Sequence, residues 1–472
     1  MEEYIGGKLV EYARVLLHAI SSGAGPHSFG AVTRVNIRSM PFRRVFLFTI
    51  AIVFLFSLST PAQNGTSRID SAFQKFWAAK SPEEAERNID DIIKSGVTFD
   101  EAYRRLKAGR TYTSQSTGIV KLSYKNKEGI EHFYALNVPA TYDPAKRYQV
   151  RFQLHGGVSG RDSNQPRGTG ESPLQGAEQI YVVPYAWNAA PWWDDDQVLN
   201  LAAITDSLKR IYNIDENRVV VAGVSDGGTG AYYIAMRDTT PYASFLPLNG
   251  FIMVIANARI DDGQVFPNNL RNKPLFVVNG GKDPLYPISE VEPFVKHLMT
   301  GVNVEYHPQP DAGHNTAWWP ELKDGFEKFV ASHPRDPHPD SLTWETANLD
   351  HNRAHWLLID QFNLRPDDAQ PLPDLNLMRS VPLFSRPNRP GRVDITVNRN
   401  TIQATTRGVA GFTLLLSPDK FDFSQPVKVV ANGRTVFEGR VERDLKTLLK
   451  WAARDNDRTM LYGAEVKIKL AR

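Results

Sequence analysis

A serine between glycines is the residue of this chain best suited to nucleophilic chemistry. Residues 223–228 read Gly-Val-Ser-Asp-Gly-Gly, which fits the pattern G-x-S-x-G with Ser225 at its centre. A strand expected over 218–222 precedes the motif and a helical pattern over 228–237 follows it, which is the context that the motif requires. Glycines two positions before and after the serine let strand and helix approach closely. A sharp turn there would lift the Ser225 hydroxyl clear of a sheet.

A serine hydroxyl is a weak nucleophile, so it needs a general base that is itself oriented by an acid. Asp283 follows a strand expected over 274–278, and His314 follows a strand expected over 302–307. Both would lie at the carboxyl ends of strands, where the functional groups of open α/β sheets gather. The chain order serine, acid, histidine fits this kind of fold. Asp311 is the rival acid, but it stands three residues before His314 and is better placed to shape that loop.

A glycine-rich loop could stabilise the negative charge that acyl transfer places on the carbonyl oxygen. The residues His155-Gly156-Gly157 follow a strand expected over 148–154, and glycine lets a backbone N–H approach an oxyanion closely. Two such donors are worth about 10²–10³-fold in rate each. We expect them to be the N–H groups of Gly157 and of Asp226, the residue after the nucleophile. His155 is also a candidate for contact with substrate.

Five tryptophans fall on loops expected near the same face. Either they wall a cleft for an aromatic or acyl group, or they pack the loops, and both interpretations stay open. The candidates for contact with substrate are Trp192, Trp193 and Trp318. The consecutive acids at 194–196 are better explained as a helix start than as a metal site, because adjacent carboxylates do not converge easily on one ion. We therefore expect no metal there.

The elements that must position these groups alternate along the chain. Apolar runs predict strands over residues 148–154, 179–183, 218–222, 251–256, 274–278 and 302–307. Helical patterns lie between several of them, notably over 196–212 and 228–237. This alternation is typical of an α/β domain with a mostly parallel sheet flanked by helices, here over 118–333. Residues 118–139 read as an antiparallel hairpin at the edge of that sheet.

Three further segments flank this domain. Residues 63–117 read as helical, with a capping box at Ser81-Pro82-Glu83-Glu84, and we expect them to pack on the α/β domain. Residues 334–391 are rich in proline and read as a linker region with short strands. Residues 392–472 read as a β-rich domain with one helix over 445–453 and a hairpin turn at Asn432-Gly433.

The N-terminal 62 residues have the pattern of an export signal. The run over 45–58 is nearly all apolar, Arg43 and Arg44 precede it, and small residues that suit cleavage after Ala62 follow. The sequence therefore predicts a secreted or periplasmic protein that meets a membrane only through this signal. Because a start at Met40 would give a signal of ordinary length, we expect residues 1–39 to be an upstream extension. An uncleaved membrane anchor is the alternative.

Composition excludes several classes of function. The 55 basic and 52 acidic residues leave a formal charge of +3, and no basic stripe with interleaved aromatics is present, so we expect no nucleic-acid partner. The chain contains no cysteine, which excludes disulfides, thiol nucleophiles and Cys-ligated zinc.

These motifs together resemble those of the α/β-hydrolase family, and within it the secreted esterases related to polyhydroxybutyrate depolymerases and feruloyl esterases. The resemblance rests on Leu154-His155-Gly156-Gly157, on residues 212–228 and on Gly313-His314, and its region covers about half of the chain. It implies a triad of Ser225, Asp283 and His314 that hydrolyses a small-molecule or polymer ester through an acyl-enzyme, with no cofactor. Depolymerase-like relatives often contain disulfides, whereas this chain has no cysteine, and its C-terminal β-region does not resemble a substrate-binding domain that we can name. Both points weaken the assignment of a polymer substrate.

Two other functions stay open. A serine peptidase of the prolyl-oligopeptidase type would share the serine turn and the triad, but the N-terminal segment is too short and too helical to form its β-propeller. The second is a surface binding module whose hydrolase core has lost its catalytic activity. The complete set of four catalytic elements argues against it.

Overall fold

The computed structural model describes residues 61–255, 265–363 and 390–470, and Gly65–Arg472 forms one compact unit. Within these ranges no helix has both the length and the apolar character needed to cross a membrane. The apolar run over 45–58 and the extension over 1–39 lie outside the described residues, so the export signal stays a prediction.

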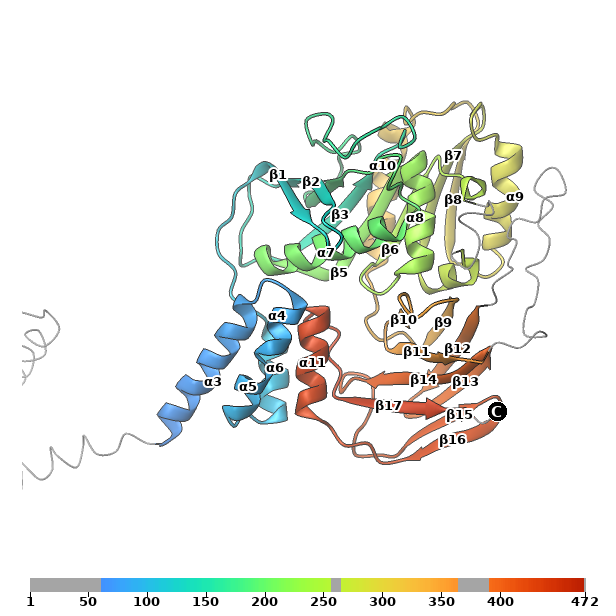
Figure 1. The fold of residues 1–472 in the computed structure, drawn as a ribbon. Coiled ribbons are helices and arrows are strands. Elements are labelled where there is room, and N and C mark those ends of the chain that lie inside the picture. The colour runs from blue at the N-terminus through green and yellow to red at the C-terminus, as the bar shows by residue number, and fades with distance from the viewer. Residues whose placement is uncertain (1–60, 256–264, 364–389, 471–472) are drawn as a thin grey trace, which may run out of the picture. The chain divides into compact units, whose positions relative to one another are not determined.

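The largest element is an eight-stranded, mostly parallel sheet with the strand order β1-β2-β4-β3-β5-β6-β7-β8 (Figure 1). Only the β1–β2 and β2–β4 pairs are antiparallel, which confirms both the predicted sheet and its edge hairpin. The strands are β1 Gly118–Lys125, β2 Glu131–Val138, β3 Tyr148–Leu154, β4 Ile180–Pro184, β5 Ile214–Val224, β6 Ser244–Leu248, β7 Leu275–Gly280 and β8 Val304–Gln309.

Helices cover both faces of this sheet because alternate side chains of its strands are buried on opposite sides. On one face, Val219 and Val221 of β5 share a core with α7 Asp195–Ile211, α8 Asp226–Arg237 and α9 Ile288–Leu298. On the other face, Val220 and Ala222 pack with α10 Trp319–Ser332 (Figure 1). The acids at 194–196 do begin a helix, since the Asp194 carboxylate accepts the backbone N–H of Asp196 and caps α7.

The prediction of a strand over residues 251–256 is wrong. The strand that follows β5 and α8 lies earlier in the chain, at β6, and Ile252–Val254 forms a short 3₁₀ helix instead. Asn249 has a φ of 46°, a left-handed conformation that turns the chain out of the extended path after β6. The apolar residues that follow are therefore buried outside the sheet.

The C-terminal region is a β-sandwich of a four-stranded sheet, β10-β11-β14-β17, and a five-stranded sheet, β16-β15-β13-β12-β9, that share one core. The Asn432-Gly433 hairpin is confirmed, with φ of 49° and 78° at the turn. The strands are β9 Ser341–Thr346, β10 Arg353–Ala354, β11 Leu357–Phe362, β12 Gly391–Asn398, β13 Thr401–Arg407, β14 Val409–Leu416, β15 Val427–Ala431, β16 Arg434–Gly439 and β17 Ala464–Lys469.

The short strands assigned to the linker region belong to this sandwich. Strand β9 pairs with β12, and β11 pairs with β14, so the sandwich begins near residue 341 rather than at 392. Strand β13 was not predicted, because only Ile402 and Ala404 of its polar sequence are buried. The first difference arises from pairing between segments far apart in the chain, which composition does not reveal.

The N-terminal helices pack mainly on the helix of the C-terminal region, α11 Leu445–Asp455, rather than mainly on the α/β domain as expected (Figure 1). Phe73, Ile92 and Leu106 share a core with Leu448 and Leu449. In the predicted capping box the Ser81 hydroxyl accepts the Glu84 N–H, but the Glu84 carboxylate accepts the N–H of Lys80. The helices are α3 Pro61–Ala78, α4 Pro82–Arg87, α5 Ile89–Lys94 and α6 Phe99–Ala108.

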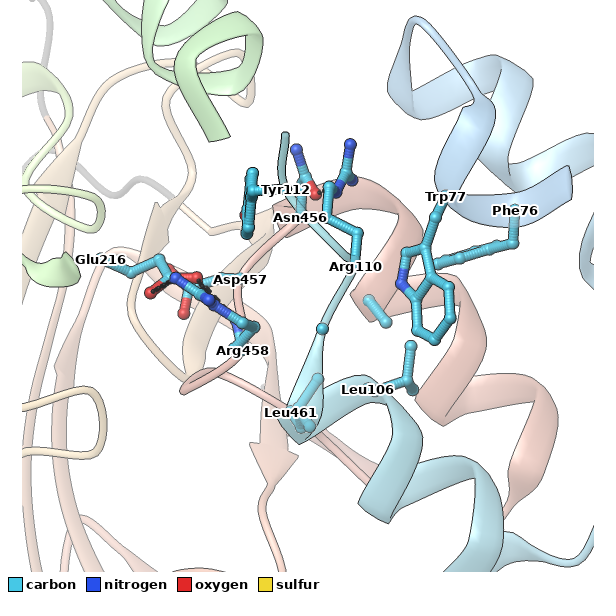
Figure 2. A pocket seen from close by; sticks show the side chains of 12 residues that line it. Phe76, Trp77, Leu106, Arg110, Tyr112, Glu216, Asn456, Asp457, Arg458 and Leu461 are labelled. Carbon is cyan, nitrogen blue, oxygen red and sulfur yellow. Dashed lines mark hydrogen bonds and ion pairs between the residues drawn. The ribbon is translucent and has the colours of Figure 1, made fainter. Parts of the chain in front are cut away.

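The seam where these helices approach the C-terminal segment is closely packed. A cavity of about 30 Å³ remains there, lined by residues that include Trp77, Arg110 and Arg458 (Figure 2). That volume has room for little more than a water molecule.

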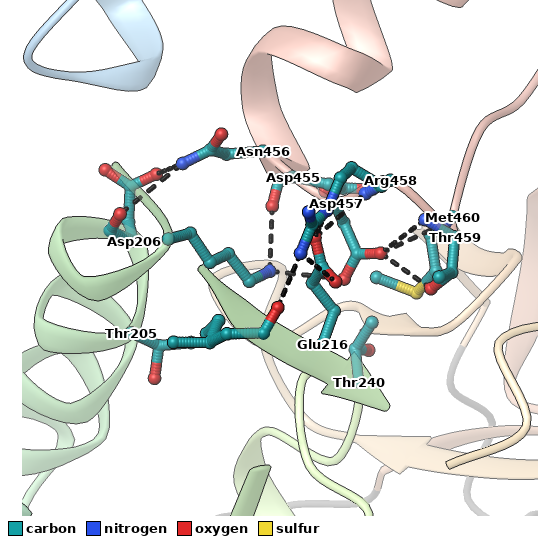
Figure 3. A network of polar contacts seen from close by, with 12 residues as sticks. Thr205, Asp206, Glu216, Thr240, Asp455, Asn456, Asp457, Arg458, Thr459 and Met460 are labelled. Atoms are coloured by element: carbon teal, nitrogen blue, oxygen red, sulfur yellow. Dashed lines mark hydrogen bonds and ion pairs between the residues drawn. The ribbon is translucent and has the colours of Figure 1, made fainter. Parts of the chain in front are cut away.

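A buried ionic network joins the α/β domain to the C-terminal region (Figure 3). The Asp457 carboxylate lies 2.8 Å from Arg335 Nη2 and 3.2 Å from Lys209 Nζ. Beside it, Arg458 Nη2 donates to Glu216 Oε2 at 2.9 Å. Since Lys209 and Glu216 belong to α7 and β5, these ion pairs hold the two regions against each other.

The Asp457→Asn variant is expected to lose about 3 kcal/mol in the free energy of unfolding at pH 7, because Arg335 and Lys209 stay buried without their shared counter-charge. Burial acts to raise the pKa of Asp457, but the charges of Arg335 and Lys209 outweigh it and hold that pKa well below its usual range. Since the pKa of Asp457 in the folded chain lies below the unfolded value of about 3.9, the ionised carboxylate makes its full contribution to the free energy of unfolding above about pH 5.

As the pH falls below about 4, the advantage of the wild-type chain over this variant is expected to shrink by about 1.4 kcal/mol per pH unit. Urea denaturation at pH 7 and pH 3 measures the difference. The control is Asp91→Asn, whose ion pair with Lys75 is exposed and which we expect to change stability by less than about 0.5 kcal/mol. If the difference in unfolding free energy between the wild-type chain and Asp457→Asn were the same at pH 3 as at pH 7, it would contradict the stabilising role assigned to the ionised Asp457.

Candidate active site

Ser225 occupies a strained turn between β5 and α8. Its φ of 59° and ψ of −120° lie outside the regions that residues other than glycine prefer. The flanking glycines are required by close packing. A Cβ on Gly223 would lie 2.0 Å from the carbonyl oxygen of Gly227, and one on Gly227 would lie 2.1 Å from that of Leu154. The turn therefore has the geometry that the motif predicts.

The structure brings His314 between Ser225 and Asp283. His314 Nε2 lies 2.7 Å from Ser225 Oγ, and His314 Nδ1 lies 2.6 Å from Asp283 Oδ2. The three residues follow β5, β8 and β7, so all lie at the carboxyl edge of the sheet. A neutral imidazole that donates from Nδ1 to the carboxylate leaves Nε2 free to accept the serine proton.

Asp283 is held rigidly, whereas the rival acid is not near the histidine ring. The other oxygen of the buried Asp283 carboxylate accepts the backbone N–H groups of Leu285 and Tyr286, each at 2.9 Å. Asp311 instead forms a surface ion pair with Lys282 at 2.6 Å, and 92% of its side chain is exposed. Geometry thus favours Asp283 as the partner of His314.

The loop after β3 lies against the nucleophile. A Cβ on Gly156 would come within 2.9 Å of the Ser225 Cβ, and Gly157 has a φ of 65°. No side chain caps the start of α8. The first N–H groups of a helix have no partner within it, so the Asp226 N–H is available to an oxyanion. These positions are compatible with the expected pair of donors.

His155 holds this loop through hydrogen bonds of its ring. Its Nε2 accepts the N–H of Ala186 at 3.1 Å, so Nδ1 carries the proton and donates to the Gly156 carbonyl at 2.9 Å. Burial lowers the pKa of His155 to about 4, which keeps the ring neutral. Both ring nitrogens are hydrogen-bonded within the protein, and the expected contact of this side chain with substrate stays a prediction.

Two of the three tryptophans expected to line the cleft are buried inside the protein. Trp192 is inaccessible to solvent and donates its indole N–H to the His155 carbonyl at 2.7 Å. Trp318 packs with Phe326 of α10. Both indoles fill the space between loops and sheet, which supports the loop-packing interpretation. Trp193 is only partly buried against the core, so its contact with substrate stays a prediction.

One side chain beside these residues was not predicted. The ring of Tyr286 lies perpendicular to the ring of His314, with 5.0 Å between ring centroids, and its hydroxyl donates to Asp226 Oδ1 at 3.3 Å. The sequence signal is weak, since Tyr286 only stands three residues after Asp283 on the same loop. Its approach to α8 depends on the adjacency of β5, β6 and β7.

Comparison with known proteins finds no matching family model. Over 231 residues, or 46% of the chain, the protein is 24% identical to the bifunctional acetylxylan esterase/xylanase XynS20E of Neocallimastix patriciarum, covering 32% of that protein. Over 156 residues, or 31% of the chain, it is 28% identical to the probable feruloyl esterase C of Aspergillus terreus, covering 57% of it. The chain thus spans about a third and somewhat over half of the length of these relatives.

Among solved structures, a thermostable esterase matches 46% of this chain and 63% of its own, with 22% identity and a TM-score of 0.36. The strand order, the helices on both faces and the turn at Ser225 are those of an α/β-hydrolase. The domain built on the eight-stranded sheet therefore has the α/β-hydrolase fold, and the curated proteins to which it is similar are esterases.

Proposed function

We propose that the protein is a serine hydrolase that cleaves carboxylic esters through an acyl-enzyme. The observation that carries this proposal is the continuous hydrogen-bonded chain from Ser225 through His314 to the buried Asp283. The esterase names of the curated relatives support an ester as the substrate.

In the proposed mechanism Ser225 Oγ attacks the ester carbonyl while His314 Nε2 takes its proton. Asp283 holds the imidazole in the required tautomer and stabilises its positive charge. The N–H groups of Gly157 and Asp226 bind the oxyanion of the tetrahedral intermediate. His314 then protonates the leaving alcohol, and the same groups direct water to the acyl-enzyme in the second half of the reaction.

A substrate panel separates the three candidate functions. The full chain is titrated with a fluorophosphonate, the adduct is located by mass spectrometry, and kcat/KM is measured on p-nitrophenyl acetate, methyl ferulate and a proline-containing peptide p-nitroanilide. We expect one adduct per chain, at Ser225, and turnover of the esters only. Faster cleavage of the anilide would favour the prolyl-oligopeptidase-like peptidase. Folded protein without an adduct would favour a binding module.

We also propose that the protein is exported, because residues 40–62 have the order of charged, apolar and small residues found in secretory signals. Recovery from a secreting host of a protein that begins at Gln63 would support cleavage. A protein that keeps the apolar run and stays with the membrane fraction would support the anchor.

A further inference from the structure

Three loops of the candidate site meet at the carboxylate of Asp226. Its Oδ2 accepts the backbone N–H of Val158, at the end of the loop that carries Gly157, with an N···O distance of 2.7 Å. Its Oδ1 accepts the hydroxyl of Tyr286, from the loop that carries Asp283. Asp226 itself begins α8, directly after Ser225. The side chain of Asp226 therefore has contacts separate from those expected of its backbone N–H.

The Tyr286 hydroxyl is a dependable donor in this position. Burial and the neighbouring Asp226 carboxylate, as a charge and as a hydrogen-bond acceptor, raise the pKa of Tyr286 to about 12. The phenol thus keeps its proton throughout the pH range in which an esterase works. Its ring packs against Phe251, with 5.4 Å between centroids, and against His314. These contacts fix the direction in which the hydroxyl points.

A carboxylate next to an oxyanion would oppose catalysis unless its charge were directed elsewhere. Two negative charges a few ångströms apart repel each other strongly where solvent is excluded. Hydrogen bonds from Val158 and Tyr286 engage both Asp226 oxygens and direct them at the two loops. The carboxylate can then act as an anchor for the oxyanion loop, whose preceding residues are held by the bonds of His155.

We propose that Tyr286 and the Asp226 carboxylate form a positioning pair that sets the oxyanion loop against the nucleophile. Tyr286 holds the carboxylate, the carboxylate holds the N–H of Val158, and the adjacent Gly157 N–H stays aimed at the acyl oxygen. The inference rests on the proposed function and adds residues that act through others. Tyr286 also has a side-chain contact with Ser225. In this scheme it is a positioning residue, because the effect assigned to it passes through Asp226.

A double-mutant cycle tests the pair in the full-length chain. Tyr286→Phe, Asp226→Ala and the double variant are compared by kcat and KM on p-nitrophenyl acetate and by the rate of fluorophosphonate labelling. We expect Tyr286→Phe to lower kcat and the labelling rate about 10-fold with little change in KM, since one hydrogen bond to a charged group is lost. Asp226→Ala should lower them further, and the double variant should match Asp226→Ala.

Conservative and remote variants complete the experiment. Asp226→Asn should restore most of the rate, because its amide oxygen can accept the Val158 N–H while its amide nitrogen donates to Tyr286. The matched control is Tyr306→Phe, which removes a buried hydroxyl that has no hydrogen-bond partner among the described residues. It should leave kcat unchanged. Thermal unfolding of each variant shows whether a lower rate reflects loss of the fold.

The outcomes separate this inference from the proposed function. A Tyr286→Phe effect that persists undiminished in the Asp226→Ala background would mean that Tyr286 acts directly on Ser225 or on substrate, and it would overturn the pair. A labelled and active wild-type chain with an unchanged Tyr286→Phe rate would overturn the pair alone. A folded wild-type chain that is neither labelled nor active would overturn both.

Discussion

Replacing Ser225 by alanine is expected to abolish fluorophosphonate labelling and to lower kcat on esters by about 10⁴- to 10⁶-fold. Ser225 Oγ is the atom at which the hydrogen-bonded chain through His314 and Asp283 ends. Without it, no covalent intermediate forms, and the residual rate comes only from the oxyanion donors and from binding. The fold should survive, since the turn depends on the close approach at Gly223 and Gly227.

Intact-mass analysis and an ester assay on the same preparations measure this effect. The control is Ser332→Ala, which removes an exposed hydroxyl near the end of α10 and should keep full labelling and activity. Labelling of Ser225→Ala at another residue, or activity within 10-fold of wild type, would mean that the nucleophile lies elsewhere.

The Asp283→Asn variant should lose about 10⁴-fold in kcat while keeping its fold and its KM. The carboxylate oxygen that accepts the N–H groups of Leu285 and Tyr286 must remain an oxygen after the substitution. The new amide nitrogen is therefore turned toward His314 Nδ1, 2.6 Å away in the wild-type chain. An amide can only donate there, so the proton moves to Nε2, where it blocks transfer from Ser225.

Asp311→Asn is the matched control because it makes the same chemical change in the rival acid. Asp311 pairs with Lys282 at the surface, and among the described residues the side chain of His314 bonds to Asp283 and Ser225 instead, so we expect activity within about 2-fold of wild type. Steady-state kinetics on one ester compares the two variants. A larger loss in Asp311→Asn than in Asp283→Asn would reverse the assignment of the acid.

Much of the site could be predicted because the sequence patterns that identify its residues are short and local. A G-x-S-x-G turn, a glycine loop after a strand and two polar residues past strand ends can each be recognised within about ten residues. A parallel sheet brings carboxyl ends of strands to one edge, so Ser225, Asp283 and His314 could be placed on that edge without knowing the strand order. Their mutual distances required the tertiary structure.

The features that the sequence left open or predicted wrongly depend on contacts between distant segments. Trp192 and Trp318 occur on loops near the site, but whether an indole lines a cleft or fills a core depends on what packs over it. The apolar run after Asn249 favours a strand by composition but forms a short 3₁₀ helix, because apolar content alone does not separate a strand from a buried turn. The strand β6 was missed for the same reason.

The amino-acid sequence by itself determined the class of the main domain, most of its strands and helices and the residues able to carry nucleophilic chemistry, because periodicity and turn chemistry are local properties. Tertiary structure decided the rest. It paired β9 and β11 with strands of the C-terminal sandwich, packed the N-terminal helices on α11 and brought Tyr286 to Asp226. These contacts join residues far apart in the chain, and their partners are selected by burial and complementary charge in the folded state.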